Sequence, residues 1–172
     1  HMEVNLMEAA YIAPLIRATE HVFGMVLQSE VVVQAPALKS ANAVSHDVSG
    51  IIGLSGDVTG AVVLSFPIDV AESVVTKFTG MDMTHEHEDF ADAIGELVNM
   101  IAGNAKAKFE GKRVSISCPS VVVGSGHQVF QSKDTTIVEI PCSCDCGAFL
   151  VDVSIKETQT VASGAEAVGA EA

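Results

Sequence analysis

Four residues between positions 92 and 103 have side-chain types and a spacing that could support polar chemistry. At about 100° per residue on a helix, Asp92, Glu96, Asn99 and Gly103 fall within about 60° of one another. A carboxylate can pair with a cation, and a carboxamide has both a donor and an acceptor with which to hold a water molecule. A polar stripe is ordinary on an amphipathic helix, so this spacing alone does not identify a site. Asn99 and Gly103 are nevertheless poor helix formers at positions where Lys, Glu or Ala would be expected.

The helix that must carry this stripe is expected over residues 90–109, and Gly111 should end it. The face opposite the polar stripe carries apolar residues, which would pack on a core. They are Phe90, Ile94, Leu97 and Ile101. A glycine in the polar stripe leaves room for another backbone to approach the helix closely. The pattern therefore predicts an amphipathic helix whose polar face points away from the core.

Two further helices and several strands are expected around this helix. The first helix spans residues 4–28 and is broken by Pro14. The second spans residues 67–78 and stops at Gly80. Apolar runs predict strands at 31–33, 48–57, 59–66, 114–118, 136–140 and 147–155. Residues 37–47 are polar and are expected to form a loop.

The chain contains a weak internal repeat. A helix, a β-branched strand, a proline, a loop and two apolar strands follow one another over residues 4–66 and again over residues 90–155. Pro36 and Pro119 lie at equivalent places in the two copies. This order predicts an α/β (α+β) fold built from a duplicated helix–strand unit, with long helices packed on a mainly antiparallel β-sheet.

The length and composition favour one folded domain. The chain has 172 residues, of which 48% are hydrophobic, and can therefore bury a real core. We expect the domain over residues 3–156, a tag remnant at 1–2 and a flexible tail at 157–172. No apolar stretch is long enough to span a bilayer, and no signal peptide is recognisable. The four cysteines, three of them crowded into residues 142–146, do not resemble a secreted disulfide framework. The absence of these signals and the cysteine spacing together favour a reduced, cytoplasmic protein.

The charge balance restricts the classes of partner. Asp and Glu total 22 against 9 Lys and Arg, which gives a formal charge of −13. Such a surface repels phosphate backbones, so we expect no binding to nucleic acid or to a membrane. The acidic field favours a basic partner, a cationic ligand or a metal. Six of the 22 acids lie just ahead of or within the polar stripe: Asp82, Glu86, Glu88, Asp89, Asp92 and Glu96.

Two other groups of residues offer alternative chemistry. Cys142, Cys144 and Cys146 would share one face of a strand and could form a metal or redox site. Their spacing is tighter than zinc sites favour, so small residues at a strand start or hairpin are the better interpretation. The segment 85–88 reads His-Glu-His-Glu and could hold a metal weakly. Histidines two residues apart do not face each other on a helix, which favours a solvated linker.

The stretch from Asp92 to Lys106 resembles the Asp/Ser-x3-Glu-x2-Asn signature of the CheC/CheX/FliY chemotaxis phosphatases, with CheX-type members the most similar. Three further segments resemble the same family in the same order, and the resemblance extends over about residues 4–156. They are Val48–Gly56, Gly60–Phe66 and Ser117–Gly124. The family signature places its proline further beyond the Asn than Pro119 lies beyond Asn99. No Glu-x-x-Asn occurs on the first expected helix, so one site per chain is expected.

The resemblance implies hydrolysis of the aspartyl phosphate of a CheY-like response regulator. Asn99 would orient the attacking water, and Glu96 would pair with a Lys beside the regulator's phosphate. Asp92 and Gly103 would help docking. No cofactor or metal of the chain's own is expected, because the Mg²⁺ belongs to the regulator.

The resemblance also implies a homodimer, with the strands near the C-terminus as the expected pairing edges. The alternative function is a non-catalytic module of the same fold that binds a response regulator or a flagellar-switch component.

Overall fold

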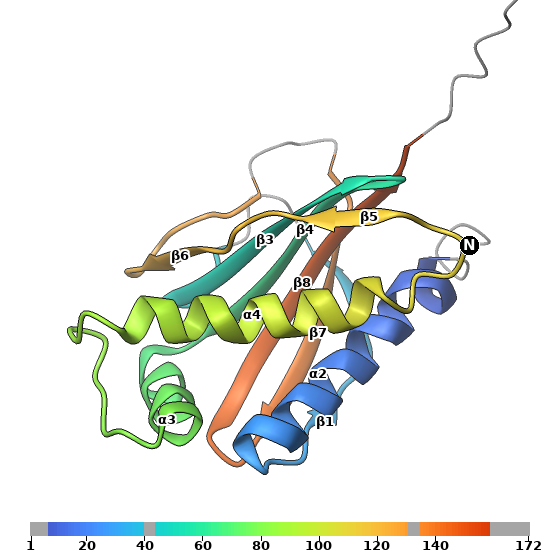
Figure 1. Cartoon of the computed structure of the whole chain (residues 1–172). Coiled ribbons are helices and arrows are strands. Elements are labelled where there is room, and N and C mark those ends of the chain that lie inside the picture. The colour runs from blue at the N-terminus through green and yellow to red at the C-terminus, as the bar shows by residue number, and fades with distance from the viewer. Residues whose placement is uncertain (1–6, 40–43, 131–134, 159–172) are drawn as a thin grey trace, which may run out of the picture.

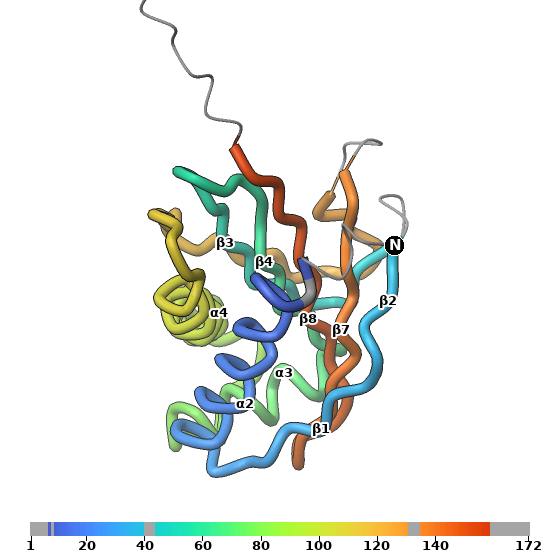
Figure 2. The backbone as a smooth tube through the Cα atoms, turned by 90° about the vertical axis from the view of Figure 1, so that its right-hand side faces the viewer, coloured from blue at the N-terminus to red at the C-terminus, as the bar shows by residue number. Residues whose placement is uncertain are grey.

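A mainly antiparallel sheet of eight strands forms one layer, and the helices cover one of its faces (Figures 1 and 2). The computed structural model describes residues 7–39, 44–130 and 135–158. The helical elements are the π-helical turn η1 (Glu8–Ile12), α2 (Ala13–Leu27), α3 (Ile68–Thr79) and α4 (Phe90–Lys106). The strands are β1 (Val32–Val33), β2 (Ala37–Lys39), β3 (Val48–Gly56), β4 (Val58–Phe66), β5 (Val114–Ile116), β6 (Ser120–Val123), β7 (Ile137–Cys144) and β8 (Gly147–Glu157). The predicted fold class is confirmed.

The two halves of the chain have the same order of elements, as the repeat predicts. A helix is followed by two short strands on either side of a proline, and then by a hairpin. The strand order is β1-β7-β8-β4-β3-β5, with β2 also beside β7 and β6 also beside β3. Each half therefore pairs its short strands with the hairpin of the other half. Pro36 and Pro119 interrupt the two edges, where a residue without an N–H group costs the ladder least.

Three expectations are corrected by this topology. Residues 37–39 form strand β2, paired with β7, where a loop was expected. The helix expected over 90–109 ends at Lys106, and a turn follows it. The C-terminal strands are not pairing edges, because β8 lies between β4 and β7 and β7 is flanked by β1 and β2. The edges of the sheet are instead the proline-interrupted pairs β1/β2 and β5/β6.

Helix α4 lies across the helical face of the sheet and packs against α2, β3 and β6 (Figure 1). Its predicted apolar stripe is buried, with Phe90, Ile94, Leu97 and Ile101 at most 1% exposed. Among the described residues, no helix is long and apolar enough to cross a membrane.

A buried ion pair joins an edge strand to the middle of the sheet. Lys39 Nζ on β2 lies 2.7 Å from Asp152 Oδ2 on β8, and 3.4 Å from Glu139 Oε2. The side chain of Asp152 is 0% exposed and that of Lys39 is 8% exposed. Burial raises the pKa of Asp152, and the hydrogen bond and charge of Lys39 oppose this effect. Asp152 Oδ1 has no hydrogen-bond partner in the described part of the chain, so Lys39 is its principal compensation.

Candidate functional site on helix α4

The polar stripe lies on the face of α4 that the sheet and α2 leave uncovered. Asp92 and Glu96 are exposed, and Asn99 and Gly103 are half-buried. Within the described ranges, the side chains of Asp92, Glu96 and Asn99 make no hydrogen bond or ion pair. The amide of Asn99 and the carboxylate of Glu96 lie one helical turn apart and are both available to an external partner.

An edge of the sheet runs along one side of this stripe. A Cβ at Gly95 would lie 3.2 Å from Pro119 Cγ, and a Cβ at Gly103 would lie 4.0 Å from Ile116 Cδ1. Gly95, Asn99 and Gly103 are four residues apart and form one ridge of α4. The segment from Ile116 to Pro119 therefore passes beside the turn that carries Asn99.

Ser117 holds this edge at the interruption between β5 and β6. Its backbone N–H donates to the carbonyl oxygen of Gly53 at 2.9 Å. Its hydroxyl accepts a hydrogen bond from the Gly53 N–H, also at 2.9 Å. Regular pairing with β3 resumes at Ser120, opposite Ile51. The Ser117 hydroxyl thus takes the place of a backbone acceptor in the ladder with β3. It keeps the segment between β5 and β6 attached to β3 next to Pro119.

The site therefore has a second wall that was not assigned as part of it from the sequence. Ser117, Cys118 and Pro119 are exposed beside the Asn99 ridge, whereas their sequence indicates only a resemblance to the family. The sequence signal for this wall is the pair of glycines four residues before and after Asn99, of which the polar stripe contains only Gly103. Two small residues flanking a larger one on a ridge indicate close approach by another segment.

Close packing at Gly95 gives the first prediction. Gly95→Leu must displace Pro119 or α4, because even a Cβ meets Pro119 at 3.2 Å. We expect the free energy of unfolding to fall by about 1–3 kcal/mol. The matched control is Gly24→Leu on α2, where a Cβ has nothing within 4 Å and the better helix propensity should stabilise slightly. Urea denaturation of both variants tests this, and equal midpoints would contradict the close approach.

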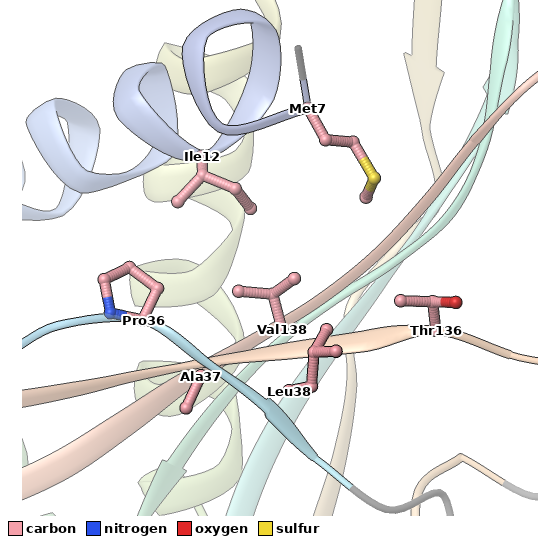
Figure 3. A pocket seen from close by; sticks show the side chains of 7 residues that line it. All are labelled: Met7, Ile12, Pro36, Ala37, Leu38, Thr136 and Val138. Carbon is pink, nitrogen blue, oxygen red and sulfur yellow. The ribbon is translucent and has the colours of Figure 1, made fainter. Parts of the chain in front are cut away.

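The apolar pocket between η1 and the β2 edge is a poorer candidate (Figure 3). Met7 and Ile12 project from the helical side toward Leu38 and Val138. The volume is about 70 Å³ and the lining contains no titratable side chain: Met7, Ile12, Pro36, Ala37, Leu38, Thr136 and Val138. A space of this size and chemistry offers no group for proton or phosphoryl transfer.

The cysteine run does not form a metal site in the described residues. Cys142 and Cys144 lie on β7, whereas Cys146 lies in the turn before β8. Burial raises the pKa of Cys142 to about 12, so its thiol stays protonated at neutral pH. Across residues 7–39, 44–130 and 135–158, no three His, Cys, Asp or Glu side chains are arranged to hold an ion.

The α4 site belongs to a sequence with recognisable relatives. A family model described as "Chemotaxis phosphatase CheX" matches residues 48–143, more than half of the chain. The chain belongs to the CheX family. The CheY-P phosphatase CheX of Thermotoga maritima is 32% identical over 140 residues, which covers 80% of this chain and 89% of the relative.

Solved CheX structures share the fold over nearly their whole length. A chemotaxis protein CheX from Desulfovibrio desulfuricans has a TM-score of 0.77 and 29% identity, covering 84% of this chain and 97% of that one. CheX in a CheX–CheY–BeF₃–Mg²⁺ complex from Borrelia burgdorferi has a TM-score of 0.72 and 26% identity, covering 86% and 98%. Thermotoga maritima FliY shares only the fold, at 13% identity and a TM-score of 0.65, covering 90% of this chain and 89% of that one. The predicted CheC/CheX/FliY relationship is confirmed.

Proposed function

We propose that this CheX-family protein hydrolyses the aspartyl phosphate of a CheY-type response regulator. The observation that carries the proposal is the pair of exposed Glu96 and half-buried Asn99 on the uncovered face of α4, which make no hydrogen bond or ion pair among the described residues. A relative with 32% identity is named a CheY-P phosphatase, and a structural relative is in complex with CheY. We place the reaction in the cytoplasm, in keeping with the free thiols of all four cysteines.

Asn99 would orient the attacking water. An acyl phosphate is an activated mixed anhydride, so the catalyst need not provide a covalent nucleophile. Phosphoryl transfer depends mainly on positioning and on stabilisation of charge. The Asn99 carboxamide can accept a hydrogen bond from a water and donate one to a phosphoryl oxygen, which would hold the water in line with phosphorus. Asn99 is half-buried on the ridge between Gly95 and Gly103, beside the segment that contains Ile116 and Pro119.

Glu96 would dock the regulator. Its exposed carboxylate would pair with a Lys beside the regulator's phosphate, and Asp92 one turn earlier would add to the same negative field. Gly103 would let the regulator approach the ridge closely, since a Cβ there meets only Ile116, at 4.0 Å. The Mg²⁺ is part of the phosphorylated regulator and needs no ligand from this chain.

A homodimer is part of the same proposal. The edge β5/β6 runs beside the α4 ridge, whereas β1/β2 forms the opposite edge of the sheet. Pairing through β1/β2 would leave Glu96 and Asn99 accessible to a regulator on both subunits. Light scattering at several protein concentrations tests the stoichiometry.

The direct test is the release of inorganic phosphate from a phosphorylated CheY-type regulator, with and without this protein. We expect acceleration proportional to the protein concentration. Binding of the phosphorylated regulator without faster phosphate release would instead favour the alternative, a non-catalytic module that binds a response regulator or a flagellar-switch component.

Glu96→Ala should weaken docking and slow the reaction together. Loss of one partner of a close charge pair is expected to cost about 2 kcal/mol, or roughly 30-fold in kcat/KM. The control is Glu30→Ala, which removes an exposed carboxylate beyond the end of α2. Steady-state phosphate release at several regulator concentrations separates KM from kcat. A Glu96→Ala variant with the kcat/KM of the control would rule out the docking role.

A further inference from the structure

Basic residues gather at the end of the molecule where α4 stops. Four of the nine Lys and Arg residues fall within residues 106–113, directly after the polar ridge. They are Lys106, Lys108, Lys112 and Arg113. A fifth, Arg17, lies on α2, whose first turns lie beside the C-terminal end of α4 (Figure 1). In a chain with a formal charge of −13, this end is a local concentration of positive charge.

Arg17 and Lys108 line the same cleft. The cleft has a volume of about 420 Å³ and lies between the start of α2, the turn after α4 and the end of β8. Both side chains are exposed, and neither has an ion-pair partner among the residues that the structure describes. Glu157 lines the cleft too, but its carboxylate accepts a 2.6 Å hydrogen bond from the hydroxyl of Tyr11 and lies 3.5 Å from Lys112 Nζ. Glu110 lines the cleft as well and is exposed. The lining therefore holds three basic and two acidic side chains, which leaves it with a net positive charge.

Helix electrostatics explains only part of this arrangement. A Lys in the last turn of α4 stabilises the negative end of the helix dipole, which accounts for Lys106. It does not account for Arg17, which comes from a different helix and faces the same hollow. Acidic residues outnumber basic ones by 22 to 9, so intramolecular partners are plentiful in the chain. The net positive charge of this lining, in a chain with a formal charge of −13, therefore favours an external anionic group.

The cleft continues the surface on which the regulator is proposed to dock. Lys106 lies seven residues after Asn99, so it is on the same face of α4 and about 10 Å further along the axis. The cleft begins directly beyond that point, with Lys108. Along one line the surface therefore changes from acidic at Asp92 and Glu96 to basic at Lys108 and Arg17.

We propose that Arg17 and Lys108 bind carboxylate side chains on the surface of the docked response regulator. This inference rests on the proposed function and adds a second, oppositely charged contact to it. Acidic side chains lie at one end of the ridge and basic side chains at the other. The regulator can therefore dock in only one direction along α4. Its Lys-bearing site is then held over Glu96 and Asn99.

Binding of a CheY-type regulator, activated with beryllium fluoride and Mg²⁺, tests this without requiring catalysis. We expect the Arg17→Gln/Lys108→Gln variant to raise the Kd by about three- to tenfold at low ionic strength, and by much less at about 0.5 M salt. The kcat for phosphate release should not change, because neither side chain reaches the phosphoryl group. The control is Lys77→Gln/Lys156→Gln, which makes the same charge change at two exposed lysines, on α3 and β8, that do not line the cleft.

Two results would overturn the inference. One is a Kd for the cleft variant equal to that of the control. The other is binding of inorganic phosphate that the cleft substitutions abolish without changing the Kd for the regulator, which would make the cleft a small-anion site. A wild-type protein that releases no phosphate contradicts the proposed function, whereas the Kd comparison still decides this inference.

Discussion

Asn99→Ala is expected to lower the rate of phosphate release by about 10²–10³-fold and to leave the Kd for the activated regulator nearly unchanged. The amide makes no hydrogen bond to another described residue, so its removal should cost little stability. What is lost is the group proposed to hold the water in line with phosphorus, an interaction that matters mainly in the transition state.

Asn104→Ala is the matched control for this experiment. Asn104 is on the same helix and is also half-buried, but it lies off the polar ridge. It should retain the wild-type rate. Single-turnover phosphate release, with binding titrated separately, distinguishes lost chemistry from lost docking. An Asn99→Ala variant as fast as Asn104→Ala would exclude Asn99 as the residue that orients the water.

Lys39→Met is expected to have the largest effect on stability, lowering the free energy of unfolding by about 3–5 kcal/mol. The substitution leaves the carboxylate of Asp152 buried at 0% exposure without the cation that lies 2.7 Å away. Burial already raises the pKa of Asp152, so its ionised form is unfavourable in the folded state. The defect should therefore shrink as the pH falls through the folded-state pKa of Asp152, because the folded protein then binds a proton that the unfolded chain holds less tightly.

The double variant Lys39→Met/Asp152→Leu provides the control. Removing both charges leaves no fully buried ion without a partner, since the remaining Glu139 is partly exposed, so most of the lost stability should return. Urea denaturation at neutral and mildly acidic pH measures both effects. A single variant as stable as wild type, or a defect that grows on acidification, would show that Lys39 does not compensate Asp152.

Local sequence patterns were sufficient to predict the elements that have strong periodicity or clear boundary residues. The apolar stripe from Phe90 to Ile101 identified α4, and the structure buries all of it. Pro67 and Gly80 delimit α3 as its cap residues, the glycine with a φ of 71°. The polar ridge could be placed on the exposed face for the same reason, since a single helix determines which residues share a face.

The remaining features depend on partners distant in the sequence. Strand β2 has only three residues, and its pairing with β7 could not be read from its own composition. Asp152 stands within an apolar run, and its partner Lys39 is 113 positions away. The wall formed by Ile116 and Pro119 beside Asn99 arises from tertiary packing. A local sequence pattern does not indicate which residues of the sheet edge lie beside which turn of α4.

The exchange of short strands between the two repeats means that the chain cannot be divided at its internal repeat. Strands β5 and β6 of the second repeat are held by β3 of the first, and β1 and β2 of the first are held by β7 of the second. Helix α4 itself lies on β3 at Gly50, where a Cβ would come within 3.1 Å of both Ile94 and Val98. Both repeats therefore determine the shape of the surface around Asn99, even though the residues proposed for catalysis come from the second repeat alone. A change in the first repeat can alter that surface without touching Glu96 or Asn99.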